Sequence, residues 1–370
     1  MVRPLALLAP LLLLAACLGG DTGRSGISAT ATPGLTPQAT PASAFTPPRE
    51  LPHLTLDDIF PPRDVSTLNL DPSRLRTIIA TGDVIPARAT DGAIRARGDD
   101  FLYPVRKTAT ITSDADLTVI NLEAPLIEGC PPHNSGFTFC GRPGFVEALR
   151  AAGVDVATLE NNHIGNYGFQ GVAETKEHLS SAGIDYADRA TLAVRNVRGL
   201  EFGFLAFNGV GEAIDRQQLR QQIRAARPQV DVLAVAFHWG AEYVSLPQPA
   251  PGIAEDLPTE IARLAVDAGA DLVIGNHPHW VQAMEIYKGK LIVYAHGNFI
   301  FDQMWSYETR VGVIGRYTFY DAVLLRAEFT PVLIENYAQP RPLKGVERRA
   351  VLDGMREASL ALRRQLAAEQ

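Results

Sequence analysis

From about residue 75 onward, short apolar runs alternate along the chain with longer segments whose apolar residues recur at helical spacing. Continuous short runs are typical of buried strands, and amphipathic segments are typical of helices that cover a sheet. We expect strands at residues 76–80, 117–122, 154–159, 200–207, 230–237, 271–274, 291–295, 317–329 and 332–337. We expect helices at residues 144–152, 171–182, 215–226, 253–268 and 347–369. Strands and helices that alternate in this order predict the α/β fold class.

Polar residues follow six of the expected strands at the points where they end. The clusters are residues 81–83, 121–123, 161–163, 238, 276–277 and 296–298. In open α/β sheets, ligands bind just beyond the carboxyl ends of the strands. We therefore expect these side chains, although distant in the sequence, to meet at one edge of the sheet.

Five of the eight histidines lie at these strand ends, namely His163, His238, His277, His279 and His296. A single histidine after a strand is more often a capping or core residue, but five of them predict a binding site. Asp83, Glu123 and Asn162 add oxygen ligands to the set. Imidazole and oxygen donors without thiolates suit divalent Mn, Fe or Zn.

The His277-Pro278-His279 segment indicates how two of these imidazoles are arranged. The residue before a proline favours extended backbone, and residues two apart in an extended chain point to the same side. Both imidazoles are then able to serve one metal or two neighbouring ones. A carboxylate such as Glu123 can bridge two cations about 3.5–4 Å apart, as in two-metal sites. We therefore expect a site for divalent metal that holds two ions.

The first residues have the pattern of a secretory leader. Arg3 precedes an apolar core, residues 5–14, of roughly the length of a signal-peptide core. Small residues before Cys17 resemble the lipobox of bacterial lipoproteins. We expect residues 1–16 to be a lipoprotein signal peptide and Cys17 to be lipidated, which would anchor the protein at a membrane surface. An ordinary signal peptide with an incidental cysteine is the alternative.

Composition divides the rest of the chain into three parts. Residues 18 to about 50 are rich in Gly, Thr, Ser, Ala and Pro, which bury too little apolar surface to fold. We expect a disordered linker that, together with Cys17, covers residues 17–73. The folded domain is expected at residues 74–340 and a helical tail at residues 341–370.

Export would place the other two cysteines, Cys130 and Cys140, in an oxidising compartment. The loop between them contains Pro and Gly and is rich in turn-forming residues. We expect a disulfide between them. A pair of free or buried thiols is the alternative, and a zinc cage is disfavoured because there is no second cysteine pair.

The net charge of the chain argues against one class of partner, nucleic acids. The 34 basic and 41 acidic residues give a net charge of −7. Proteins that bind nucleic acid unaided usually carry a basic surplus, so no nucleic-acid partner is expected. No interior apolar run reaches the roughly 18 residues that a spanning helix needs.

The polar strand ends belong to longer motifs that carry a family resemblance. The motifs are Gly82-Asp83 with Arg88, Asn121-Leu122-Glu123, Asn161-Asn162-His163, His238-Trp239-Gly240 with Glu242-Tyr243, Gly275-Asn276-His277-Pro278-His279, and Gly297-Asn298-Phe299. As an ordered set over residues 76–303, they resemble the CapA family of bacterial poly-γ-glutamate capsule-synthesis proteins. That family is similar to the calcineurin-like metallophosphoesterases, so the resemblance implies a four-layer α/β/β/α sandwich.

The resemblance also implies a role for each matched metal ligand. Asp83 and His279 would hold one metal. Asn162, His238 and His277 would hold the other. Glu123 would take the place of the bridging carboxylate, and a metal-bound water would be the nucleophile.

The remaining matched residues would act on the substrate or on the ligands. His163 would protonate a leaving group, and Arg88 and Asn298 would face the substrate. Glu242 would orient His238 as a partner outside the ligand set, or would have a structural role.

Several positions depart from the family pattern. Ile85 stands where the phosphoesterases have a ligand histidine, so the first metal has one donor fewer. Asn166 replaces an Asp, and Glu160 replaces a small residue. His296 replaces a Leu, where it either restores a donor from outside the matched ligands or only alters the pocket.

Two hypotheses about function follow from these observations. The first is a membrane-tethered, metal-dependent hydrolase that acts on an anionic cell-surface polymer such as poly-γ-glutamate, at a phosphoester or a γ-glutamyl amide. The second is a non-catalytic accessory that binds the polymer during export or anchoring. Both place the protein outside the cytoplasm, on the membrane, with a capsule-synthesis complex as a further partner.

Overall fold

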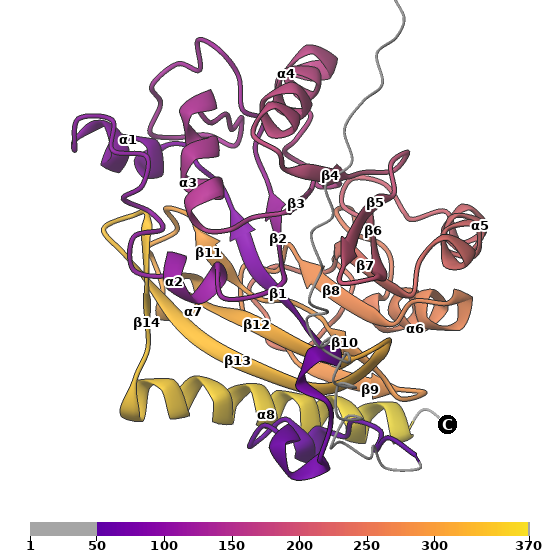
Figure 1. The fold of residues 1–370 in the computed structure, drawn as a ribbon. Helices are drawn as coiled ribbons and strands as arrows, with labels where there is room; N and C mark the ends of the chain where they lie inside the picture. Colours follow the sequence, from indigo (N-terminus) through magenta and orange to yellow (C-terminus); the bar gives the residue numbers. More distant parts are fainter. Residues whose placement is uncertain (1–49, 369–370) are drawn as a thin grey trace, which may run out of the picture. The chain divides into compact units, whose positions relative to one another are not determined.

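Two β-sheets lie at the centre of the structure, a computed structural model that describes residues 50–368 (Figure 1). In hydrogen-bonded order, the first sheet runs β14 (Gln339–Pro342), β13 (Val323–Glu335), β12 (Val311–Tyr320), β1 (Leu75–Val84), β2 (Leu117–Leu122), β3 (Val156–Thr158) and β4 (Asp185–Ala187), and β11 (Asn298–Ile300) also pairs with β1. The second sheet runs β5 (Ala193–Val197), β6 (Leu200–Asn208), β7 (Val232–His238), β8 (Leu272–Asn276), β10 (Lys290–Val293) and β9 (Met284–Tyr287). The expectations for the leader peptide, for Cys17 and for the linker up to residue 49 lie outside the described residues.

Helices cover the outer faces of the two sheets. The helices are α1 (Ala89–Arg95), α2 (Ala109–Thr112), α3 (Val146–Ala151), α4 (Gly168–Ser181), α5 (Arg216–Ala226), α6 (Pro258–Ala268), α7 (Tyr307–Arg310) and α8 (Gly345–Ala368). Short 3₁₀ helices add to these before β1 and beside α3 and α5.

Three hydrophobic cores separate the layers. One core contains side chains of both sheets, such as Phe202 and Phe319, whose ring centroids are 5.9 Å apart. A second lies between the first sheet and the helices that supply Leu149 and Leu179. A third lies between the second sheet and the helices that supply Ile223 and Ile261. The layers therefore follow the order helix, sheet, sheet, helix, and the predicted four-layer α/β/β/α sandwich is confirmed.

Parallel pairing aligns the carboxyl ends of the central strands in each sheet. In the first sheet, Asp83 of β1 is in register with Asn121 of β2 and with Asn298 of β11. In the second sheet, His238 of β7 is in register with Asn276 of β8. Polar residues that are far apart in the sequence thereby lie together at the carboxyl ends of the strands in each sheet, as predicted.

The segment before β1 differs from the expected linker. Residues 50–73 contain three 3₁₀ helices, and Leu54, Ile59 and Leu70 are buried in hydrophobic cores. The expectation that disorder extends to residue 73 is therefore wrong for residues 50–73. Proline-rich composition continues into this segment, but its leucines and isoleucine bury enough apolar surface to fix it on the domain.

The end of the chain also differs in detail from the expectation. The strand expected at residues 317–329 is two antiparallel strands, because a tight turn at Asp321 separates β12 from β13. Residues 332–335 belong to β13. The expected tail is α8, whose Met355 and Leu362 are buried in two of the cores, so it is an integral part of the domain. Among the described residues, no helix is long and apolar enough to cross a membrane.

A close approach of two backbones joins β1 to the segment that precedes β11. A Cβ atom at Gly82 would lie 2.1 Å from the carbonyl oxygen of Gly297, so any side chain at this position would force the strands apart. The backbone amide of Asp83 donates to the same carbonyl at 3.0 Å. Glycine at position 82 therefore lets Asp83 and Asn298 lie side by side.

We predict that Gly82→Ala lowers the free energy of unfolding by about 1–3 kcal/mol, the usual cost of overpacking a dense core. Gly354→Ala is the matched control, since nothing lies within 4 Å of a Cβ atom built there in α8. The control is expected to raise stability by about 0.5–1 kcal/mol through helix propensity. Urea denaturation of both variants measures the difference, and equal effects would contradict the close-approach explanation.

Candidate metal centre

Five ionisable side chains from both sheets converge at the aligned strand ends. Asp83 comes from β1, and Glu123 follows β2. His238 ends β7, and His277 and His279 follow β8. All five are at most 4% exposed, so they form a buried polar cluster between the two sheets.

The ligand atoms of this cluster are close enough to share cations. Those of Asp83, Glu123 and His238 lie within 4.8 Å of one another, and so do those of Glu123, His277 and His279. Glu123 belongs to both groups, which is the position of a bridging carboxylate. We expected His277 to share a metal with His238 and Asn162. In the structure, His277 instead groups with His279 and Glu123. The His277 ring is nevertheless next to both neighbours, at 4.8 Å from the His238 centroid and 5.9 Å from that of His279.

Several donor atoms in the cluster have no hydrogen-bond partner. Neither carboxylate oxygen of Glu123 nor either ring nitrogen of His277 has one. Leaving such buried groups unpaired costs on the order of 1–3 kcal/mol each. A divalent cation would satisfy them, and the mixture of imidazole nitrogen and carboxylate oxygen fits Mn, Fe or Zn. The residues present therefore fit the implied metal.

Asn162 joins the cluster through His238. The Oδ1 atom of Asn162 is 2.8 Å from Nε2 of His238, which also lies 3.3 Å from Oε1 of Glu123. The neighbouring Asn161 shapes the turn, because its Oδ1 accepts from the backbone amides of His163 and Ile164. This turn places Asn162 next to the clustered side chains.

The His277-Pro278-His279 segment brings its two imidazoles together by a route that differs from the prediction. His277 has φ 96° and His279 has φ 55°, so neither residue is extended. Positive φ is strained for residues other than glycine, and such strain is concentrated at functional sites. The predicted proximity holds, but a sharp turn produces it.

His279 is held by partners on both of its ring nitrogens. Its Nδ1 lies 3.2 Å from Oδ2 of Asp83 and 2.9 Å from Oδ1 of Asn298. Its Nε2 lies 3.8 Å from Oε1 of Glu242. Glu242 thus contacts His279, whereas we expected it to orient His238.

Two residues that we expected to face the substrate have other partners. Asn298 is fully buried, and its amide nitrogen donates to the carbonyl of Thr309 at 2.9 Å, so it holds His279 in place. Arg88 forms an ion pair with Asp302 and donates to the carbonyl of Gly136 at 3.0 Å. These contacts engage the Asn298 side chain and both terminal nitrogens of Arg88, whose Nε has no hydrogen-bond partner.

His296 does not supply the missing donor. Its Nδ1 lies 3.2 Å from the carbonyl oxygen of Gly275, and its Nε2 lies 2.7 Å from the hydroxyl of Tyr317. Both ring nitrogens are used, so His296 connects the two sheets as a structural residue. The donor lost at Ile85, which is buried among apolar side chains, is not restored by His296.

His163 is half-buried at the side of the cluster. Its Nδ1 lies 3.1 Å from Oδ1 of Asn166, and its ring packs against Phe139 with centroids 4.3 Å apart. Burial lowers the pKa of His163 to about 4. The hydrogen bond to the uncharged Asn166 raises the pKa of His163, but burial lowers it by more.

Burial and mutual charge set the protonation of the metal-free cluster. Burial raises the pKa of Glu123 well above its ordinary value, and the charge of Asp83 adds to this. Burial lowers the pKa of His238 to about 4 and that of His277 well below its ordinary value. Burial alone would also lower the pKa of His279, but its hydrogen bond to Asp83 and the surrounding acidic groups raise it to about 9.

Sequence reasoning assigned no role to the amides that connect these ligands. Asn121 donates from Nδ2 to Oδ1 of Asp83 at 2.8 Å, and the same nitrogen lies 3.3 Å from Nδ1 of His238. Asn161 in turn donates to Oδ1 of Asn121 at 3.1 Å. The signal for Asn121 was available, because strand alternation places it on the same face as Glu123 two residues later.

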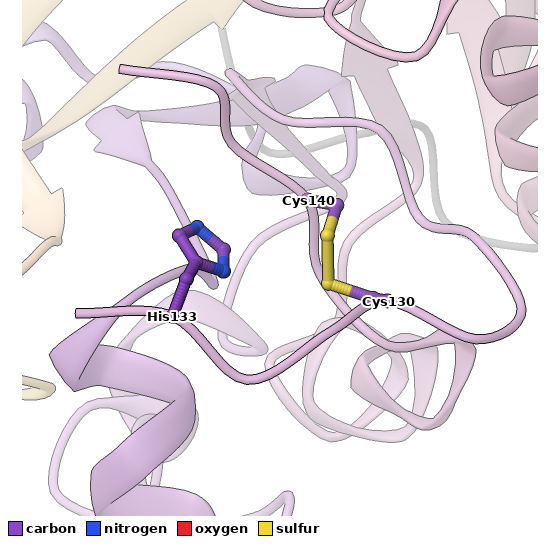
Figure 2. A group of neighbouring side chains, drawn as sticks. All are labelled: Cys130, His133 and Cys140. Carbon is purple, nitrogen blue, oxygen red and sulfur yellow. A yellow bond between two sulfur atoms is a disulfide. The ribbon is translucent and has the colours of Figure 1, made fainter. Parts of the chain in front are cut away.

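The predicted disulfide between Cys130 and Cys140 is present in the structure. Figure 2 shows the bond, which joins residues 10 positions apart with Cα atoms 5.9 Å from one another. His133 lies in the same loop, and its Nδ1 donates to the carbonyl of Pro131 at 3.0 Å. The bond closes the loop that leads back toward His163.

Comparison with known proteins supports the same family. Residues 77–303 match the family described as bacterial capsule synthesis protein PGA_cap. The capsule biosynthesis protein CapA of Bacillus anthracis is 26% identical, over 72% of this chain and 69% of its own length. The PGA biosynthesis protein CapA of Bacillus subtilis is 31% identical, over 71% of this chain and 72% of its own length.

Among solved structures, a hypothetical protein from Thermus thermophilus aligns with a TM-score of 0.44 and 16% identity, over 69% of this chain and 98% of its own. The family match spans the strands and turns that supply Asp83, Glu123, Asn162 and the three clustered histidines. The chain belongs to the bacterial capsule synthesis protein family, as the resemblance to CapA implied.

Proposed function

We propose that this protein is a metal-dependent hydrolase of capsule synthesis that acts on an anionic polymer of the γ-glutamyl type. The observation that carries the proposal is the buried cluster of imidazoles and carboxylates, in which the donor atoms of Glu123 and His277 lack hydrogen-bond partners within the protein. The polymer class is supported by the family and by the names of its relatives in Bacillus. The bond cleaved is a phosphoester or a γ-glutamyl amide.

The proposed cation ligands are the six residues that the sequence singled out. They are Asp83, Glu123, Asn162, His238, His277 and His279. Divalent cations bound there would act as Lewis acids that acidify a water molecule and neutralise charge on the scissile group. Burial in a low-dielectric pocket strengthens both effects, because solvent does not screen the charges.

His163 is proposed to exchange a proton with the substrate. Its Nδ1 is engaged by Oδ1 of Asn166, so we assign the proton exchange to Nε2. Asn298, which contacts His279, is itself held by Gln303, because Asn298 Nδ2 donates to Oε1 of Gln303 at 3.3 Å. Gln303 also donates to the hydroxyl of Tyr243 at 3.1 Å, so this side is linked to the outer aromatic residues.

We also propose that the protein acts at the membrane surface outside the cytoplasm, within a capsule-synthesis complex. The support is the sequence pattern of residues 1–16 followed by Cys17, together with the capsule-related family. Metabolic labelling with a palmitate analogue tests the anchor. Incorporation that is lost in Cys17→Ser is expected, and incorporation that persists in this variant would exclude lipidation at Cys17.

The hydrolase is tested with purified full-length protein, loaded with Mn²⁺ or Zn²⁺ and given a chromogenic phosphodiester or poly-γ-glutamate. We expect metal-dependent turnover of one of them, reduced by about 10²–10⁴-fold in His163→Ala, the usual effect of losing a general acid or base. Polymer binding that needs no metal and yields no product would instead establish the non-catalytic accessory.

Glu123→Gln is predicted to separate metal binding from stability. Losing the bridging carboxylate should weaken Mn²⁺ binding by about 100-fold or more. The metal-free variant should be at least as stable as the parent, because a buried carboxylate without partners is replaced by a neutral amide. Calorimetric titration and thermal melting of the metal-free protein measure the two effects.

His296→Ala is the matched control for Glu123→Gln. It removes an equally buried residue whose nitrogens are both hydrogen-bonded within the protein. It should therefore lower the melting temperature of the metal-free protein and leave Mn²⁺ affinity within about threefold. Unchanged Mn²⁺ affinity in Glu123→Gln would contradict the proposed centre.

The raised pKa of His279 predicts opposite pH dependences for stability and for metal binding. Its pKa of about 9 lies above the ordinary value of 6.5, so the protonated form stabilises the metal-free fold. This contribution is complete below about pH 6.5 and is lost as pH rises through about 9. A cation must displace the proton, so its affinity should rise up to about tenfold per pH unit in this range.

Urea denaturation of the metal-free protein and Zn²⁺ titrations, both between about pH 6.5 and 9.5, measure the two trends. His279→Gln should flatten the stability curve, because the glutamine does not titrate. Stability of the metal-free parent that increases over this range would show that His279 is not protonated beside Asp83.

A further inference from the structure

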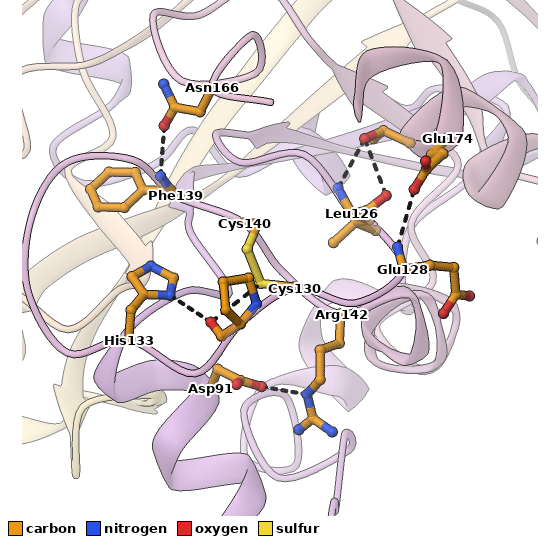
Figure 3. The surroundings of a disulfide bond; sticks show 12 residues. Asp91, Leu126, Glu128, Cys130, His133, Phe139, Cys140, Arg142, Asn166 and Glu174 are labelled. Atoms are coloured by element: carbon orange, nitrogen blue, oxygen red, sulfur yellow. Dashed lines mark hydrogen bonds and ion pairs between the residues drawn. A yellow bond between two sulfur atoms is a disulfide. The ribbon is translucent and has the colours of Figure 1, made fainter. Parts of the chain in front are cut away.

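A covalently closed loop borders the proposed site. The disulfide joins Cys130 to Cys140, and backbone hydrogen bonds between Ile127 and Gly141 at 3.0 Å and between Gly141 and Pro125 at 2.8 Å close its base. Residues 124–129 connect Glu123, at the end of β2, to Cys130, and two of them, Pro125 and Ile127, make the hydrogen bonds at the base of the loop. Figure 3 shows the surroundings of the disulfide.

The end of this loop reaches the residue that holds His163. The backbone amide of Phe139 donates to Oδ1 of Asn166 at 2.6 Å, a contact drawn in Figure 3. The same oxygen lies 3.1 Å from Nδ1 of His163. Since a backbone amide can only donate, the Asn166 atom is the acceptor, and Nδ1 of His163 must carry the proton in this contact.

The side chain of Phe139 fixes the imidazole from a second direction. Its ring lies 4.3 Å from the His163 ring and 5.8 Å from that of Phe301, and Phe139 is only 1% exposed. The Arg88 guanidinium lies 4.8 Å from the Phe139 centroid and donates to the carbonyl of Gly136 in the same loop. The loop therefore contacts His163 through both a hydrogen-bond relay and a packed aromatic face.

We propose that the disulfide-closed loop, residues 130–140, is a positioning device for His163. The covalent bond restricts Cys140, and hence the adjacent Phe139 whose amide and ring hold Asn166 and His163. The loop thereby sets the tautomer of His163, with Nδ1 protonated and Nε2 turned to the substrate. The effect of the loop on the tautomer of His163 does not depend on the proposed function. Only the expected loss of catalytic rate rests on it.

The composition of the loop explains why a covalent constraint is needed. Residues 134–138 are exposed, including Phe137 at 74%, and the loop contributes little to the main cores. Without the bond, a loop of Pro, Asn, Ser and Gly would gain conformational freedom, and the contact between Phe139 and Asn166 would weaken. Misplacement of a catalytic group by about 1 Å can reduce a rate by about 10²-fold.

The test compares the variant Cys130→Ser/Cys140→Ser with the parent by ¹⁵N NMR of metal-free protein that carries labelled histidine. The parent should show His163 as a single tautomer protonated at Nδ1, assigned by loss of the signal in His163→Ala. In the variant, the two nitrogen shifts should move toward those of a tautomer mixture. His133→Ala, which changes the same loop and leaves the disulfide intact, should retain the parental signal.

Kinetics with the metal-loaded protein provide a second readout. The double serine variant should retain its Mn²⁺ content and a KM within about twofold, while kcat falls by about 10-fold or more. In a His163→Ala background, removing the disulfide should have no further effect on kcat, because the group that it positions is absent. A loop with a merely structural role would lower stability in both backgrounds and leave the tautomer unchanged.

If the double serine variant does not fold, the variants Asn166→Ala and Asn166→Asp test the same hydrogen-bond relay to His163. The alanine should reproduce the loss of the single tautomer with the disulfide intact, and the aspartate, which keeps the acceptor oxygen, should restore it. A parental tautomer signal in the double serine variant, or in Asn166→Ala, would overturn the proposal. A protein that hydrolyses no substrate yet loses the tautomer with the disulfide would refute the proposed function and leave the positioning inference standing.

Discussion

The burial of Glu123 between two sheets, without a hydrogen-bond partner, is the constraint on which the rest of the site depends. An ionised carboxylate in this position costs on the order of several kcal/mol unless it is paired, so burial raises the pKa of Glu123 well above its ordinary value. His277 is under the same constraint, since neither ring nitrogen is paired. Three hydrophobic cores stabilise a domain that carries these unfavourable groups, and a cation would convert them into ligands.

Neutral amides hold this charged cluster together. Asn121 contacts Asp83 and His238, and Asn298 contacts His279. An amide donates and accepts without adding charge, so it orients the candidate ligands and leaves the net charge of the protein's side of the site to the carboxylates and the imidazoles. The amides also connect the two sheets, because Asn121 belongs to the first and His238 to the second.

The interior of the site is held by paired strands, whereas its edge is held by a turn and a loop. Asp83 and His238 lie on strands whose register is fixed by neighbouring strands, and Gly82 permits the close approach that completes the cluster. His163 instead stands on a turn outside the strands and depends on Asn166 and the disulfide-closed loop for its orientation. The candidate metal ligands are therefore built into the core, whereas the proposed proton-exchanging group is held by contacts that single substitutions can remove.

The local pattern of apolar and polar residues was sufficient to predict much of the fold and of the candidate metal centre. Apolar runs that end in Asp83, Glu123 and His238 identified the strands and the edge where their ends meet, because side-chain burial imposes that pattern on the sequence. Expected export and the turn-rich loop between Cys130 and Cys140 predicted the disulfide that the structure contains. It failed where a short turn interrupts an apolar run, as at Asp321 between β12 and β13.

The sequence by itself determined which residues meet, and only the tertiary structure decided what each of them contacts. Arg88 and Asn298 carry the right chemistry to bind a substrate, but Asp302 and His279 occupy them. His296 lies among the ligands in the sequence, yet it connects to Tyr317. The physical reason is that periodicity specifies the face and the end of a strand, whereas a hydrogen-bond partner depends on distances of a few tenths of an ångström that packing between distant segments sets.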